Sequence, residues 1–192
     1  MKAVVTGHTK GIGLEIFRLL QKKGYDVIGI SRQTGYDLYT DVEKVVETAK
    51  GCDLFVNNTK ISQTILVEKL HDKVDKMIVM GSIAGDYSSA IDCEYSKQKL
   101  ELQSLCHKLS LRPNTKIVHL KISMLEDSIS TDVPISFTEI VEFIDFWITY
   151  PSITSVEYSI KLTDHTLQAL ENNLRFDKTF LKKLVDQTFK HT

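Results

Sequence analysis

The N-terminal stretch KAVVTGHTKGIG, residues 2–13, decides the fold class. Its short apolar run at residues 2–6 predicts a buried strand, because no polar face interrupts it. The run leads into Gly7, Gly11 and Gly13, and apolar residues at helical spacing follow. A strand, a glycine-rich turn and a helix in this order predict a loop whose backbone approaches a phosphate at a helix N-terminus.

The remainder of the chain alternates between strand-like and helix-like segments. Further strands are predicted over residues 25–30, 53–56, 76–80, 116–122 and 156–160. Helices are predicted over residues 11–23, 42–49, 63–73, 91–111, 137–150 and 177–190. This alternation implies an α/β fold with a doubly wound parallel sheet, the Rossmann fold, in which ligands bind beyond the carboxyl ends of the strands.

Length and composition predict one ordinary globular domain. The chain has 192 residues, is 42% hydrophobic and has a formal net charge of -1. Without a run of basic residues we expect no nucleic acid as a partner, and without about 20 consecutive apolar residues we expect no membrane span. A strand that starts at the first residue leaves no room for a signal peptide, so a cytoplasmic protein is expected. Three cysteines without ligand spacing predict reduced thiols and no metal.

The glycine loop predicts a dinucleotide site. The candidate contacts within it are Gly7, Thr9, Lys10, Gly11, Ile12 and Gly13. The loop is not a P-loop, because no Gly-Lys-Ser/Thr follows it. An ordinary strand-to-helix turn is the alternative, although the position in the first strand–helix unit favours the nucleotide.

The residues after the second strand predict which dinucleotide binds. That strand ends at Ser31-Arg32, where an acidic residue would accept bonds from a ribose 2′-hydroxyl. Arg32 instead suits a 2′-phosphate, and Lys10 lies in the loop on the same side. Two cations at one corner favour NADP(H) over NAD(H). Two solvated surface charges are the alternative.

A serine, a tyrosine and a lysine form the candidate catalytic group. Ser82 follows the strand at residues 76–80, and Tyr95 and Lys99 are four residues apart on the helix predicted over residues 91–111. Residues at this spacing share one helix face, so the Lys99 ammonium can favour the phenolate form of Tyr95. This arrangement suits proton exchange with an alcohol or carbonyl. A tyrosine followed by a lysine four residues later often occurs by chance, and only the preceding serine and glycine loop make this pair significant.

Together these motifs resemble the short-chain dehydrogenase/reductase family over roughly residues 1–162. TGHTKGIG resembles its cofactor loop, and Asp53 to Asn58 (DLFVNN) resembles its strand leading into the NNAG motif. Gly81-Ser82 and the segment from Tyr95 to Lys99 (YSKQK) resemble its catalytic serine and YxxxK. Asp37-Leu38 resembles the pair bordering the adenine. Residues 163–192 match nothing in the family and are assigned to a C-terminal helical extension.

The resemblance implies roles for these residues. Tyr95 would be the general acid/base, Lys99 would favour its phenolate and hold the nicotinamide ribose, and Ser82 would orient the substrate carbonyl. Asn57 would brace the sheet near the cofactor, and Asn57 and Asn58 would both belong to the cofactor-binding residues. The implied reaction is NADP(H)-dependent hydride transfer between a small-molecule carbonyl and an alcohol. Pairing of the long helix with its copy would imply a homodimer or homotetramer.

The chain also departs from the family pattern. Thr59-Lys60 stands where the family has Ala-Gly, and Asn58 lies only 24 residues before Ser82. The helix in that interval carries no asparagine to match the family's further catalytic residue; Gln63 or a water is the candidate substitute. A non-catalytic NADP(H)-binding sensor or scaffold is therefore the alternative function. A structural protein without any nucleotide is the least favoured alternative.

Overall fold

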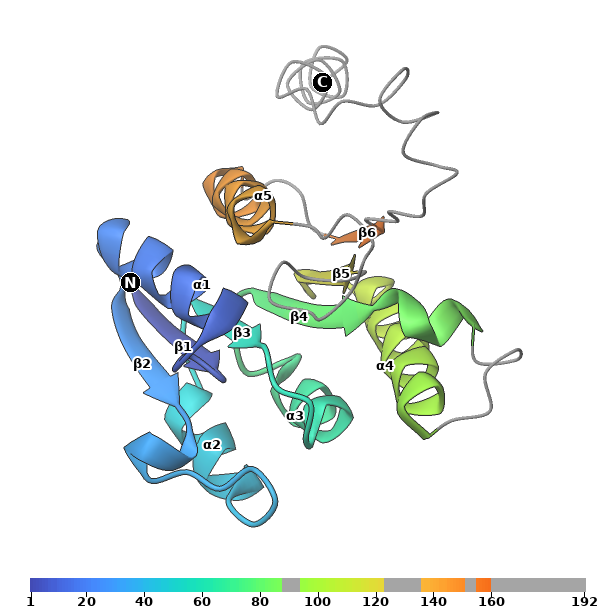
Figure 1. The fold of residues 1–192 in the computed structure, drawn as a ribbon, viewed down its shortest axis with the longest axis horizontal. Coiled ribbons are helices and arrows are strands. Elements are labelled where there is room, and N and C mark those ends of the chain that lie inside the picture. The colour runs from blue at the N-terminus through green and yellow to red at the C-terminus, as the bar shows by residue number, and fades with distance from the viewer. Residues whose placement is uncertain (88–93, 123–135, 151–154, 160–192) are drawn as a thin grey trace.

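The computed structural model describes residues 1–87, 94–122, 136–150 and 155–159. In this part of the chain a sheet of parallel strands has the order β2-β1-β3-β4-β5-β6 (Figure 1). The strands are β1 (Lys2–Thr6), β2 (Asp26–Ile30), β3 (Leu54–Asn57), β4 (Met77–Ser82), β5 (Ile117–Ile122) and β6 (Ser155–Ser159). The predicted doubly wound α/β fold is thereby confirmed.

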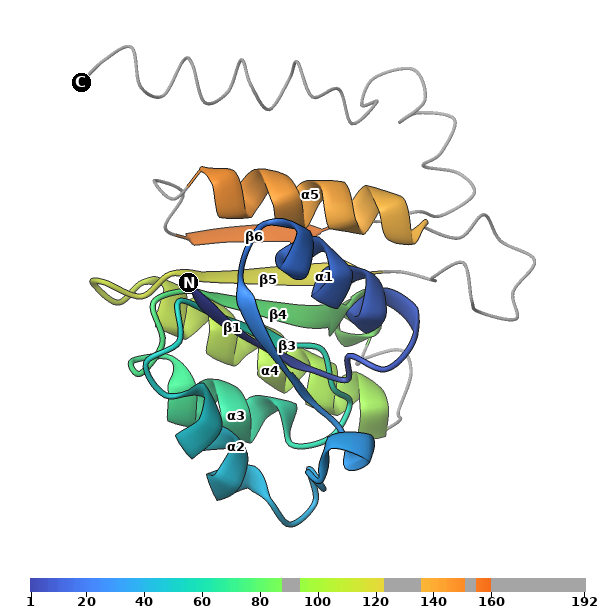
Figure 2. The ribbon, with the colours of Figure 1, turned by 90° about the vertical axis from the view of Figure 1, so that its left-hand side faces the viewer.

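Helices lie between successive strands and cover the sheet. They are α1 (Gly11–Lys22), α2 (Val42–Ala49), α3 (Gln63–Leu70), α4 (Glu94–Ser110) and α5 (Phe137–Thr149), with short 3-10 helices η1 (Arg32–Thr34) and η2 (Ile83–Tyr87). Figure 2 shows α1 and α5 on one face and α2, α3 and α4 on the other. None of the helices in the described ranges has the length and apolarity that a membrane crossing needs.

Strand residues alternate between two apolar cores, as the pleat requires. Val5 and Val56 face α1 and α5, whereas Val4 and Phe55 face α2, α3 and α4. Both faces of the sheet are buried, which explains why the strands are almost continuously apolar in sequence.

The predicted elements agree with the structure to within a few residues wherever the chain is described. The predicted helix over residues 91–111 is observed as α4, while residues 91–93 and the predicted helix at 177–190 lie outside the described part. On α5, Phe143 and Ile148 are buried together with Ile140, Ile144 and Trp147. Phe146 is only half-buried and contacts the ring of Tyr150, because it lies beside this apolar stripe rather than within it.

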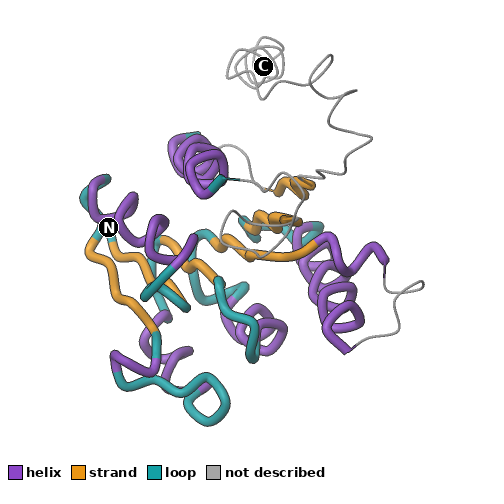
Figure 3. The backbone as a smooth tube through the Cα atoms, viewed as in Figure 1, coloured by secondary structure: helices purple, strands orange, loops and turns teal. Residues whose placement is uncertain are grey.

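The strand order creates a switch point between β1 and β3. From β1 the chain crosses over α1 to β2 on one side, whereas from β3 it crosses over α3 to β4 on the other. The loops that follow β1 and β3 therefore lead in opposite directions from the carboxyl ends of these two neighbouring strands (Figure 3). In open α/β sheets a ligand crevice forms at such a place.

Candidate functional site

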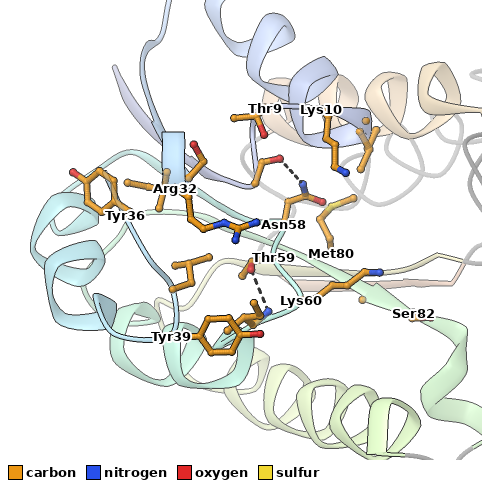
Figure 4. A pocket seen from close by; sticks show the side chains of 18 of the residues that line it. Thr9, Lys10, Arg32, Tyr36, Tyr39, Asn58, Thr59, Lys60, Met80 and Ser82 are labelled. Atoms are coloured by element: carbon orange, nitrogen blue, oxygen red, sulfur yellow. Dashed lines mark hydrogen bonds between the residues drawn. The ribbon is translucent and has the colours of Figure 1, made fainter. Parts of the chain in front are cut away.

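A cavity of about 750 Å³ opens at this switch point (Figure 4). Its volume is within the range of roughly 300–1,000 Å³ typical of small-molecule and cofactor sites. Of the predicted site residues, it is lined by Gly7, Thr9, Lys10, Gly11, Ile12, Ser31, Arg32, Asp37, Leu38, Asn58, Ser82, Tyr95 and Lys99. Tertiary folding thus brings one end of α4 to the glycine loop.

Gly13 and Asn57 are the two predicted site residues that do not line the cavity. A Cβ on Gly13 would lie 2.2 Å from the carbonyl oxygen of Gly7, so this position must be glycine for the loop to close. Asn57 is fully buried at the end of β3, and its Nδ2 donates a hydrogen bond to the backbone oxygen of Gln63. Both residues support residues around the cavity without lining it themselves.

The glycine loop has the geometry of an anion cradle. Gly7 and Gly11 have positive φ angles of 68° and 54°, which glycine adopts without strain. α1 starts at Gly11, and Lys10 at its N-cap position makes no side-chain capping hydrogen bond. The first backbone N–H groups of α1 therefore remain available to a ligand, and the positive end of the helix dipole favours an anion there.

Asn58 holds the glycine loop against the end of β3. Its Nδ2 donates to the Gly7 carbonyl at 3.3 Å, and its backbone N–H donates to Thr6 Oγ1 at 2.8 Å. Thr6 Oγ1 donates in turn to the backbone oxygen of Val56. This chain of bonds fixes the two loops on either side of the switch point, and the half-buried Asn58 also lines the cavity.

Arg32 and Lys10 both point into the cavity in Figure 4, from η1 and from the glycine loop. η1 is stabilised by reciprocal bonds between Ser31 and Thr34, and Thr34 Oγ1 also donates to the backbone oxygen of Gly29. These bonds set the start of η1 at the mouth of the cavity. Arg32 therefore presents its guanidinium to the same space as the glycine loop.

Ser82, Tyr95 and Lys99 also line the cavity, and the last two are in contact with each other. Ser82 ends β4, and its Oγ accepts a hydrogen bond from the N–H of Ala84. Tyr95 is 41% exposed in the first turn of α4, and Lys99 Nζ lies 5.4 Å from the centre of its ring. Gly85 permits this grouping, because a Cβ there would lie 2.9 Å from the backbone nitrogen of Leu100, where η2 crosses α4.

Gln63 connects this group to the sheet. Its Oε1 accepts a 2.6 Å hydrogen bond from Lys99 Nζ, while its Nε2 donates to the backbone oxygens of Asn57 and Met80. Gln63 and Lys99 are 5% and 6% exposed. The direct partner of the Lys99 ammonium is therefore this amide, and Tyr95 meets the ammonium with its ring. Gln63 was named as a candidate from the sequence, but its three contacts were not predictable.

Lys99 titrates unusually because of this environment. Burial, and after it the nearby positive charge of Lys60, lower the pKa of its ammonium from the ordinary 10.5 to about 8. At neutral pH the side chain is still mostly charged, so it can act as a cation beside Tyr95. Above pH 8 that charge is progressively lost.

This shift predicts a stability change at alkaline pH. Between pH 8 and 10.5 the unfolded chain holds the Lys99 proton and the folded chain releases it, so stability rises with pH. A shift from 10.5 to about 8 corresponds to about 3 kcal/mol. Urea unfolding should show the wild type gaining about this much relative to Lys99→Met as pH rises through the window. Parallel pH profiles of the two proteins would contradict the assignment.

Several lining residues escaped the sequence analysis. They are Ile30, Tyr36, Tyr39, Ile61, Met80 and Ile122. Ile30, Met80 and Ile122 lie at or near the carboxyl ends of their strands, and this position could have indicated them. Tyr36 and Tyr39 lie in the irregular segment between η1 and α2, where no periodic pattern exists to place a side chain. Thr59 and Lys60, noted only as departures from a family pattern, also line the cavity.

His8 takes no part in the cavity lining. Its ring lies 5.1 Å from that of Phe17 and occupies the space above Gly29, where a Cβ would come within 2.4 Å of it. A loop histidine of this kind is expected to be exposed, but His8 is half-buried. The residue supports the loop by packing.

Comparison with known proteins finds likeness in structure only. No protein-family model matches the chain, and no curated protein sequence matches it. Among solved structures, UDP-N-acetylglucosamine 4-epimerase from Bacillus cereus superposes with a TM-score of 0.66 and 16% identity, covering 90% of this chain and 84% of that one.

Two dehydrogenase structures are comparably similar. A 3-alpha-hydroxysteroid dehydrogenase from Pseudomonas sp. B-0831, complexed with NADH, has a TM-score of 0.66 and 15% identity over 82% of this chain and 94% of its own. A short-chain dehydrogenase from Sphingobium yanoikuyae, in complex with NADPH, has a TM-score of 0.66 and 14% identity over 92% and 97%. At sequence identities this low, the structural similarity establishes a shared Rossmann-type fold and nothing further.

Proposed function

We propose that this protein is an NADP(H)-dependent oxidoreductase that interconverts a small-molecule carbonyl and an alcohol. One observation carries the proposal: a single cavity joins an uncapped helix N-terminus behind a glycine loop to a serine, a tyrosine and a buried lysine. The first part suits a pyrophosphate, and the second suits proton transfer to a carbonyl oxygen. The neighbours of similar fold include structures with NADH and with NADPH.

The residues present fit such a cofactor. Gly13 packs directly against the Gly7 carbonyl, and the glycines of the loop carry no side chain that would keep a ligand away from its backbone. Lys10 and Arg32 supply positive charge for phosphates, and a guanidinium suits a 2′-phosphate in particular. Bound NADPH would supply the hydride to the carbonyl carbon.

Two side chains of the protein would bind the carbonyl oxygen and supply its proton. The Tyr95 hydroxyl would donate a proton to it, and Ser82 Oγ would orient it by a hydrogen bond. Lys99, held by Gln63, would keep a positive charge beside the tyrosine ring. One hydride and one proton thus convert the carbonyl to the alcohol.

A fluorescence titration with NADPH and with NADH tests the cofactor assignment. We expect the wild type to bind NADPH more tightly than NADH. Arg32→Ala should weaken NADPH binding about tenfold or more and leave NADH binding nearly unchanged, because only NADPH carries the 2′-phosphate that a charged hydrogen bond would hold. Arg18→Ala is the matched control, since Arg18 lies on α1, pairs with Glu15 and does not line the cavity.

An equal loss for both nucleotides in Arg32→Ala would contradict the 2′-phosphate assignment. If the wild type binds neither NADPH nor NADH, the proposed function as a whole is contradicted.

A second candidate function is a non-catalytic NADP(H) sensor. It is favoured by one observation, that the Lys99 ammonium is hydrogen-bonded to Gln63 and meets Tyr95 only at its ring. Tight NADPH binding without reduction of any carbonyl in a broad panel would favour this function over the oxidoreductase.

A further inference from the structure

The cavity holds more positive charge than the cofactor would use. Lys10, Arg32, Lys60 and Lys99 line it, and Asp37 is the single acidic residue among the described residues of the lining. Among the described residues, none of the ion pairs involves any of these four cations. Unpaired cations around one cavity attract an anionic ligand and raise its local concentration.

Three of the four cations have an assigned place. Under the proposed function Lys10 and Arg32 face the phosphates, and Lys99 is buried against Gln63 and the Tyr95 ring. Lys60 is left over. It is exposed, and no hydrogen bond or ion pair in the described part of the chain engages its ammonium.

The loop that carries Lys60 is held in place on both sides. Ile61 N–H donates to Thr59 Oγ1 at 3.1 Å, and Ser62 Oγ donates to the Leu38 oxygen at 2.6 Å. Ser62 has a φ of 55°, a conformation that a non-glycine residue adopts only when its surroundings enforce it. Lys60 therefore extends from a constrained backbone into the cavity.

Lys60 reaches toward the catalytic end of the cavity. In Figure 4 its side chain extends from the β3–α3 loop toward the side where Ser82 lies, away from Arg32. Its charge is close enough to Lys99 to lower the pKa of that residue. A flexible lysine with a single charge suits a substrate anion at a short distance from the reacting carbonyl.

We infer that Lys60 binds a carboxylate of the substrate, so that the carbonyl compound accepted by this site is an oxo acid. The inference rests on the proposed function and adds the substrate class. A lone ammonium on this side favours a singly charged group over a phosphate, which usually gathers several donors.

The test uses matched pairs, namely 2-, 3- and 4-oxo acids of about five carbons and their methyl esters. Binding to the NADP⁺ complex is measured by calorimetry, and reduction by NADPH is followed in parallel. We expect the wild type to bind at least one acid about tenfold or more tightly than its ester, as a charged hydrogen bond would provide. Lys60→Met should abolish that preference, and Lys60→Arg should retain it.

Lys22→Met serves as the matched control, because Lys22 is an exposed lysine of α1 that does not line the cavity. It should leave the acid preference unchanged. Equal binding of acid and ester by the wild type, or a preference that survives Lys60→Met, would overturn the inference.

NADPH titration of the same proteins separates the two levels of the proposal. Lys60→Met should keep NADPH affinity within about twofold of wild type. A loss of NADPH affinity as large as the loss of oxo-acid affinity would assign Lys60 to the cofactor and overturn the inference, while the proposed function would stand. A wild type that binds no NADPH would overturn both.

Discussion

Tyr95→Phe should lower the rate of carbonyl reduction by about a hundredfold or more and leave NADPH affinity within about twofold of wild type. The substitution removes only the hydroxyl, the group that would donate the proton to the carbonyl oxygen. The ring remains, and with it the contact to the Lys99 ammonium 5.4 Å from its centre. Cofactor binding and turnover should therefore separate, which a general loss of folding would not produce.

Steady-state reduction and NADPH titration of the same preparation measure the two effects. Tyr150→Phe is the matched control, because Tyr150 lies at the end of α5, contacts Phe146 and does not line the cavity. It should keep full activity. Turnover by Tyr95→Phe equal to wild type would remove Tyr95 from the mechanism.

Gln63→Leu should destabilise the fold by about 4 kcal/mol near neutral pH. Leucine leaves the buried Lys99 ammonium without its hydrogen-bond acceptor, and each buried polar group left unsatisfied typically costs about 1–3 kcal/mol. The backbone oxygens of Asn57 and Met80 also lose their donor. Urea unfolding measures the loss, and it should shrink at alkaline pH, where Lys99 becomes neutral.

The double variant Gln63→Leu with Lys99→Met identifies the source of this cost. If the unpaired ammonium dominates, removing it should recover about half of the lost stability, because a methionine side chain is stable in an apolar environment. Recovery would show strong coupling between the two positions, as expected for residues in direct contact. A double variant no more stable than Gln63→Leu would place the cost in the two backbone oxygens instead.

The contacts of Gln63 show how a short segment can complete the site. Ser82 lies only 24 positions after Asn58, and α3 occupies eight of the intervening positions. The first residue of α3 bonds at once to Asn57 at the end of β3, to Met80 in β4 and to Lys99 of the cavity lining. One amide thereby fixes the lysine that the proposed chemistry depends on.

Local sequence pattern was sufficient for the elements that bury an apolar face. The apolar runs at residues 2–6 and 76–80 predicted β1 and β4, because continuous apolar runs suit a sheet covered on both sides. The glycine loop was also predictable, since the backbone turn at Gly7 and the close approach at Gly13 demand glycine at those positions. The candidate site residues after the strands stay predictions as to role, although most of them line the same cavity.

Local sequence predicts the succession of strands and helices along the chain and the side chains at each strand end, because both depend on neighbours within a few residues. That Lys99 meets Gln63, 36 residues away, and that Lys60 extends into the cavity toward Ser82 follows only from the tertiary fold. Such contacts depend on strand order and on the exact path of a loop, and no local periodicity records either. For that reason the substrate class inferred for this site comes from the fold.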